Sequence, residues 1–172
     1  MNRLYPLYRL LILMACGILL AAGQALALEA PADPVVLTIS GPVTQANKGQ
    51  DAVFDMKMLA KLPQKTFSTR TPWYPEAMSF TGPLLRDVLA AAGARGSKIV
   101  ASALNDYKTE IPFDDALRQD AIVARLMNDQ PMPVRGKGPL FIVYPYDSKS
   151  ELRSEIYYNR SAWQLKALTV IP

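Results

Sequence analysis

Fourteen prolines and nine glycines are spread along the 172-residue chain and divide it into short segments. Because proline interrupts helices and is excluded from the interior of sheets, the elements between these residues must be short. Half of the residues are apolar and 20% are charged, a composition typical of a chain that buries a core and unlike that of a disordered one. The sequence therefore predicts one globular domain built from many short elements.

The chain contains no histidine, and its single cysteine is Cys16. The absence of histidine removes the usual zinc ligand, the Ser-His and Cys-His nucleophile pairs and the common general base at neutral pH. Most classes of hydrolase are therefore excluded. If the segment that contains Cys16 is removed, the mature domain has no thiol, which also excludes disulfides, thiolate metal sites and redox switching.

The first 27 residues have the pattern of an export signal. Arg3 and Arg9 precede an apolar run over residues 10–22, and Ala25 and Ala27 supply the small residues that a signal peptidase requires. We predict cleavage after Ala27, which leaves a single domain over residues 28–172 in the periplasm. A lipoprotein signal that ends at Cys16 is the alternative, disfavoured because the apolar run continues beyond that cysteine.

The charges of the chain bear on its partners and its export route. Without Arg3 and Arg9, 17 basic and 15 acidic residues remain and are interleaved, so we expect no nucleic-acid partner. The two arginines are not adjacent, which predicts a Sec-type signal and not the twin-arginine signal of cofactor-loaded enzymes.

Hydrophobic periodicity and turn residues predict an α+β fold with a mixed, mostly antiparallel sheet and short helices. Asp55 and Asp114 are expected to cap short helices. We expect the strand over residues 140–144 to be central, and residues 135–138 to form a hairpin connection. The pattern predicts strands over 35–40, 65–69, 99–104, 122–127, 140–144 and 163–171, and helices over 84–92 and 150–160.

Residues 80–89, FTGPLLRDVL, resemble the strand, glycine and helix of the molybdopterin-binding domain of the sulfite oxidase family. Further segments match that domain in order and spacing, and the resemblance covers about residues 68–170. It implies the α+β fold of that family. The further segments are 105–107 with 111–112, 126–133, 138–145 and 163–165.

The chain departs from the catalytic members of that family. The resemblance implies a cysteine thiolate on molybdenum ahead of the 84–92 helix, yet residues 68–81 contain no cysteine. A soft metal without its thiolate is poorly held, so we expect no molybdenum and no oxygen-atom transfer. The chain is then similar to small periplasmic proteins of this fold that bind a reduced pterin, such as tetrahydromonapterin, without a metal.

That second resemblance implies a regulatory role and not an enzymatic one. Its partner would be the periplasmic domain of an inner-membrane cyclic-di-GMP cyclase/phosphodiesterase or a sensor kinase, with an effect on biofilm formation. One alternative is a molybdenum-cofactor oxidoreductase in which Ser68 or a solvent oxygen replaces the thiolate. Another is a structural periplasmic protein with a vestigial pocket.

A pterin needs an aromatic wall and, in its plane, a carboxylate that accepts from its amino-pyrimidine edge. Trp73 and Tyr74 lie on a stiff proline-flanked loop that suits such a wall, although Trp73 suits the core equally well. Asp106 is the candidate carboxylate, although an Asn-Asp pair is more often a simple turn. The full predicted ligand set is Arg70, Trp73, Tyr74, Asn105, Asp106, Tyr107, Tyr144 and Arg160, with Tyr146 and Trp163 as further pocket or core residues.

Overall fold

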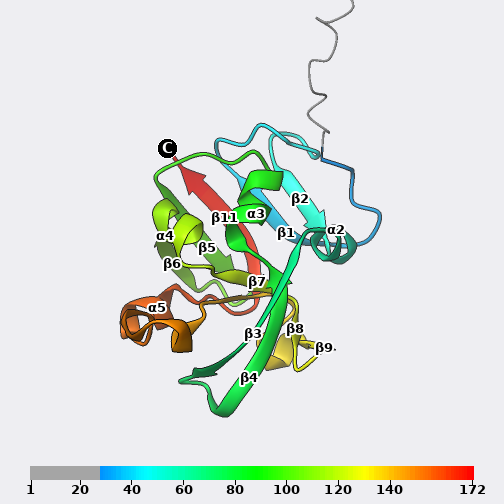
Figure 1. Ribbon diagram of the computed structural model, residues 1–172. Helices are drawn as coiled ribbons and strands as arrows, with labels where there is room; N and C mark the ends of the chain where they lie inside the picture. The colour runs from blue at the N-terminus through cyan, green and yellow to red at the C-terminus, as the bar shows by residue number, and fades with distance from the viewer. Residues whose placement is uncertain (1–27) are drawn as a thin grey trace, which may run out of the picture.

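The computed structural model describes residues 28–172, so the predicted signal peptide and Cys16 lie outside the described residues. Its strands form three sheets, with the orders β2-β1-β11-β5-β6, β3-β4-β8-β9 and β10-β7 (Figure 1). The strands are β1 (Val35–Ser40), β2 (Ala52–Asp55), β3 (Gln64–Thr71), β4 (Tyr74–Pro83), β5 (Lys98–Ala103), β6 (Lys108–Pro112), β7 (Ile122–Ala124), β8 (Leu126–Met127), β9 (Gln130–Pro131), β10 (Phe141–Val143) and β11 (Leu165–Ile171).

Short helices connect these strands. The α-helices are α2 (Met56–Lys61), α3 (Leu85–Ala91), α4 (Phe113–Arg118) and α5 (Glu155–Arg160), and the 3₁₀ helices are η1 (Val134–Gly136), η2 (Tyr146–Ser148) and η3 (Ser150–Leu152). No helix within residues 28–172 is long and apolar enough to cross a membrane.

The five-stranded sheet is mixed, as the sequence predicts. The first strand of the chain, β1, runs parallel to the last, β11, with Thr38 opposite Ala167, and the remaining pairs in this sheet are antiparallel. Strand β11 is therefore the central strand, and it joins the two ends of the described chain in one sheet. The α+β prediction is confirmed.

Strands β3 and β4 form a long hairpin that projects from the body of the molecule (Figure 1). Phe67 lies opposite Phe80 in its antiparallel register, and Pro72 and Trp73 form the turn at its tip. The residue pattern did not predict β4, because Pro75 and the Gly82-Pro83 pair interrupt its alternation; only the family resemblance implied a strand ahead of Gly82. On its other side β4 pairs with the two-residue strand β8.

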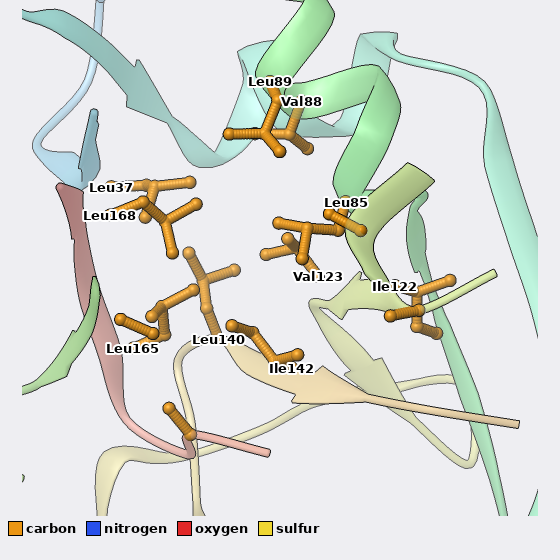
Figure 2. Close-up of a cluster of buried hydrophobic side chains, with 14 of the residues drawn as sticks. Leu37, Leu85, Val88, Leu89, Ile122, Val123, Leu140, Ile142, Leu165 and Leu168 are labelled. Carbon is orange, nitrogen blue, oxygen red and sulfur yellow. The ribbon is translucent and has the colours of Figure 1, made fainter. Parts of the chain in front are cut away.

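The core lies between helix α3 and the sheets (Figure 2). Leu85, Val88 and Leu89 of α3 are fully buried, or nearly so, and gather with Leu37 of β1 and Leu168 of β11. These three residues recur at helical spacing, so the 3.6-residue period that predicts this helix also marks its buried face. Gly93 follows the helix in a left-handed conformation, with φ of 61°, which suits glycine at that position.

Several details differ from the sequence analysis. The helix predicted over 150–160 is interrupted at residues 153–154, between the 3₁₀ helix η3 and the α-helix α5. The strand predicted over 140–144 as the central one is found at Phe141–Val143, where it is fully buried but belongs to the two-stranded sheet with β7. The 122–127 strand breaks at Arg125 into β7 and β8, which join different sheets. Residues 135–138 link β9 to β10 across two sheets and form no hairpin. Pro112 occupies the N-cap position of α4, and Asp114 lies in its first turn.

Asp55 caps α2 as predicted, and it also fixes the start of the described chain. Its carboxylate accepts hydrogen bonds from the backbone N–H of Met58 at 2.8 Å, Ala32 at 2.8 Å and Asp33 at 3.0 Å. These bonds, with that of Met58 the largest influence, lower the pKa of Asp55 below its ordinary value of 3.8. A lowered pKa in the folded state stabilises the fold above about pH 4, and this contribution is lost as the pH falls through the folded-state pKa.

We therefore expect Asp55→Asn to lower the free energy of unfolding at pH 7, because the variant loses charge-assisted bonds to three backbone donors. The difference from the wild type should begin to shrink below about pH 4, where the unfolded chain takes up the proton, and should vanish once the pH has fallen through the lowered folded-state pKa of Asp55. Urea unfolding at pH 7, 5, 4 and 3 measures both quantities. A difference that stayed constant across this range would show that the Asp55 charge does not contribute to stability.

Candidate functional site

Trp73, at the tip of the β3–β4 hairpin, packs into a cluster of aromatic rings. Its ring centroid lies 5.4 Å from that of Phe141, 5.4 Å from Trp163, 6.0 Å from Tyr158 and 6.4 Å from Tyr146, all in edge-on geometry. Edge-on contacts at these distances are favourable because the positive ring edge meets the negative ring face. The hairpin tip is therefore anchored, and the Trp73 ring has a fixed position.

The same indole forms one wall of a pocket of about 220 Å³. Three separate segments contribute to this pocket: the hairpin tip, the turn between β5 and β6, and the end of α5 with the residues that follow it. The walls combine four aromatic rings with two amides and a serine hydroxyl, and none of the lining side chains is charged. The lining residues are Trp73, Asn105, Tyr107, Tyr158, Asn159, Ser161 and Trp163.

Hydrogen bonds hold the polar side of the pocket in place. The Tyr107 hydroxyl donates to the backbone carbonyl of Asn159 at 2.8 Å, which ties the β5–β6 turn to α5. The backbone N–H of Tyr107 donates to Asn105 Oδ1 at 3.2 Å, which orients the Asn105 amide. The Asn105 Nδ2 group has no hydrogen-bond partner within residues 28–172 and remains available to a ligand.

Two hydrogen bonds on the buried side of the pocket hold the Ser161 hydroxyl in position. Its hydroxyl donates to the carbonyl of Tyr157 at 2.7 Å. Since the serine proton is used in that bond, the Tyr146 hydroxyl must be the donor in the 2.5 Å contact between Tyr146 and Ser161. Burial raises the pKa of Tyr146 well above its ordinary value, so this tyrosine stays protonated and keeps its role as donor.

Arg160 and Tyr144, both predicted ligand residues, belong to a neighbouring cluster and do not line the pocket. The Arg160 guanidinium forms an ion pair with Asp115 at 2.5 Å and lies 5.4 Å from the Tyr157 ring. Tyr144 is fully buried, and its hydroxyl has no hydrogen-bond partner within the described residues. Burial, followed by the negative charge of Asp115, raises the pKa of Tyr144 far above its ordinary value.

Asp106 also lies outside the pocket lining. Its carboxylate accepts a hydrogen bond from Lys166 at 2.9 Å, and this bond lowers the pKa of Asp106. The Asp106 backbone has a φ of 64°, as expected for the turn that the sequence also suggests. Its neighbours Asn105 and Tyr107 reach the pocket, so the predicted loop is correctly placed although the predicted carboxylate is engaged elsewhere.

Two further predicted residues, Arg70 and Tyr74, do not line the pocket. Arg70 is exposed on β3, where its backbone N–H donates to Asp147 at 2.8 Å. Tyr74 is half-buried, and its ring centroid lies 5.9 Å from the Lys137 ammonium. The sequence analysis missed Tyr158, Asn159 and Ser161, although the run Tyr157-Tyr158-Asn159 at a helix end was an available signal.

Comparison with known families identifies the chain. A family model described as "Oxidoreductase molybdopterin binding domain" matches residues 60–147, just over half of the sequence, and the chain belongs to this family. This agrees with the sulfite oxidase-type resemblance of the sequence. Comparison with curated proteins gave no significant match.

One solved structure with this fold is the sulfane dehydrogenase SoxCD from Paracoccus pantotrophus. The two structures superpose with a TM-score of 0.59 at 19% sequence identity, over 78% of the present chain. The present chain spans 37% of the SoxCD chain. At this identity the likeness shows the fold alone.

The family name implies a molybdopterin cofactor, and the donor groups of this chain do not fit the metal-bearing form. No cysteine or histidine occurs in residues 28–172, and no cluster of acidic residues in that range could hold a metal ion. The cysteine thiolate on molybdenum that the family resemblance implies therefore has no counterpart in residues 28–172. The pocket of about 220 Å³ is also smaller than the range of roughly 300–1,000 Å³ for drug-sized ligands, and its lining has no cation for a phosphate. It suits a flat, uncharged ring system.

Proposed function

We propose that this chain is a non-catalytic domain that binds a reduced, metal-free pterin in the pocket formed by the hairpin tip, the β5–β6 turn and α5. The observation that carries this proposal is the combination of a small aromatic pocket with an uncharged polar lining in a molybdopterin-binding fold. A pterin is a flat bicycle with a polar edge, and such a pocket offers it both a ring wall and hydrogen bonds.

In this proposal the two tryptophans of the pocket contact the pterin ring system, and the two asparagine amides form hydrogen bonds with its polar edge. The rings of Trp73 and Trp163 meet at 84°, so one can stack on a flat ligand while the other closes its side. The Asn105 Nδ2 group donates to the pterin carbonyl, and the side chain of Asn159 accepts from the pterin amino group. Neutral amides suffice for this edge, since each provides both a donor and an acceptor.

The biological role follows from the resemblances of the sequence and is part of the proposal. An exported pterin-binding domain without a metal suits a regulator that reports a small molecule to a membrane protein. We propose the periplasm as its location, and the periplasmic domain of a membrane-bound cyclic-di-GMP cyclase/phosphodiesterase or sensor kinase as its partner. Tetrahydromonapterin is the ligand that the resemblance suggests.

A molybdenum oxidoreductase is the competing function. The family match supports it, but the ligand it requires is poorly placed: Ser68 is exposed on β3 opposite Ser79, and it does not line the pocket. A neutral hydroxyl is also a weak substitute for a thiolate. Stoichiometric molybdenum in the protein isolated from its own cell envelope would favour the enzyme.

Two adjacent residues provide a matched test of the site. Asn105→Ala should weaken the binding of a tetrahydropterin about fivefold, the effect of one lost hydrogen bond of about 1 kcal/mol. Asp106→Asn should leave binding unchanged, because the Asp106 carboxylate interacts with Lys166 outside the pocket. Anaerobic titration with 6-hydroxymethyl-tetrahydropterin, followed by tryptophan fluorescence, measures both affinities. A larger loss in Asp106→Asn than in Asn105→Ala would place the ligand elsewhere on the loop.

A further inference from the structure

The ammonium group of Lys137 is surrounded by three aromatic rings. Its Nζ atom lies 3.7 Å from the centroid of the Trp163 ring, 5.5 Å from that of Trp73 and 5.9 Å from that of Tyr74. All three distances fall within the range of about 6 Å over which a cation is attracted to a ring face. We refer to Trp73, Tyr74 and Trp163 as the aromatic cage.

The cage attracts a positive charge but does not satisfy the hydrogen-bonding needs of a primary ammonium. Lys137 Nζ forms no ion pair and no hydrogen bond with any residue in the range 28–172. Burial lowers the pKa of Lys137, since no neighbouring carboxylate offsets the loss of water. A quaternary ammonium has no N–H groups to satisfy, and aromatic cages are known to bind such groups.

The Lys137 side chain can leave the cage without breaking a hydrogen bond. Its backbone has a left-handed conformation with φ of 75°, between Gly136 and Gly138 at the end of η1. The backbone is held separately, through the Lys137 carbonyl, which accepts from the N–H of Gln164 at 2.8 Å. We therefore expect the aromatic cage and the loop backbone to keep their positions when the Lys137 side chain moves out of the cage or is deleted.

We propose that the aromatic cage is a binding site for a trimethylammonium group, and that the Lys137 ammonium fills it in the free protein. The group could belong to a free solute of the choline or betaine type or to a phosphocholine lipid. Because the cage shares Trp73 and Trp163 with the pocket, a bound cation would lie beside it. The inference does not depend on pterin binding, which is measured separately.

The test compares choline with 3,3-dimethylbutan-1-ol, a neutral molecule of the same shape in which carbon replaces the nitrogen. Each is titrated by calorimetry into the wild type and into Lys137→Gly, since glycine accepts the left-handed backbone without strain. Choline should bind Lys137→Gly at least about threefold more tightly than the wild type. It should also bind more tightly than its neutral isostere by about 2- to 30-fold, the range expected for a cation on aromatic rings.

Two further variants separate the cage from the loop. Tyr74→Leu, combined with Lys137→Gly, removes one ring and should weaken choline binding, whereas Arg135→Ala changes an exposed cation of the same loop and should not alter it. Equal affinities of Lys137→Gly for choline and for the isostere, or an absence of choline binding, would overturn the proposal. If Lys137→Gly does not fold, the wild type must still prefer choline to the isostere, at lower affinity.

A last experiment distinguishes the two possible sources of the trimethylammonium group, a free solute and a lipid head group. Vesicles of phosphatidylcholine and of phosphatidylglycerol are sedimented with the Lys137→Gly variant. Cosedimentation with phosphatidylcholine alone would indicate a lipid head group, and binding of choline without cosedimentation would indicate a free solute. Cosedimentation with phosphatidylglycerol alone would contradict the cage, because that lipid carries no cation.

Discussion

Gly82→Ala is expected to abolish the native fold or to destabilise it by about 3 kcal/mol or more, a cost at the upper end of overpacking effects. Gly82 is buried in β4, where that strand crosses the backbone of β7. A Cβ atom at this position would lie 2.0 Å from the carbonyl oxygen of Val123, so β4 would clash directly with the backbone of β7. Neither can move aside without separating the hairpin from the core.

Urea unfolding followed by circular dichroism measures this effect, and Gly136→Ala is the matched control. A Cβ on Gly136 would meet only the side chain of Pro133, at 3.2 Å, so the control should unfold within about 1 kcal/mol of the wild type. If Gly82→Ala were as stable as Gly136→Ala, the close crossing of β4 over β7 would be incorrect.

Trp73→Ala should produce the largest loss of ligand affinity among the pocket variants. It removes the wall at the hairpin tip together with edge-on contacts to four rings. We expect tetrahydropterin to bind at least about tenfold more weakly, and the free energy of unfolding to fall by about 2 to 4 kcal/mol. Fluorescence of the remaining Trp163, measured during the pterin titration, reports the affinity.

Trp73→Phe separates the two effects, because phenylalanine keeps a ring at the hairpin tip. This variant should recover most of the lost stability and part of the lost affinity. If Trp73→Ala bound pterin as tightly as the wild type while remaining folded, Trp73 would be a core residue alone and the pocket would not be the binding site.

The sequence predicts best those helices and strands whose hydrophobic periodicity agrees with the proline and glycine residues at their ends. Strand Val35–Ser40 is found with the predicted bounds, and helix α3 with bounds within a residue of those predicted, because each combines one clear periodicity with Pro or Gly at its ends. The residue pattern did not reveal β4, because the strand carries Pro75 near the hairpin tip and Gly82-Pro83 where β7 crosses closely. The need for glycine at position 82 arises from the close approach of β7, and the sequence shows it only as a break in the alternating strand pattern.

The candidate site was predicted in part for a similar reason. Trp73, Asn105 and Tyr107 reach the pocket because they lie in short loops whose positions follow from the turn residues around them. Asp106 and Arg160 do not, since each is paired with a residue distant in sequence: Lys166 for Asp106 and Asp115 for Arg160. Local sequence patterns do not reveal such pairings, so charged residues were the least predictable members of the site.

Analysis of the protein purified from the cells that naturally produce it tests the central claim most directly. The protein is denatured under anaerobic conditions, the released small molecules are identified by mass spectrometry, and molybdenum is measured on the same sample. We predict close to one reduced pterin per chain and no stoichiometric molybdenum. Molybdenum at one atom per chain, or protein that carries no pterin and binds none when it is supplied, would contradict the account.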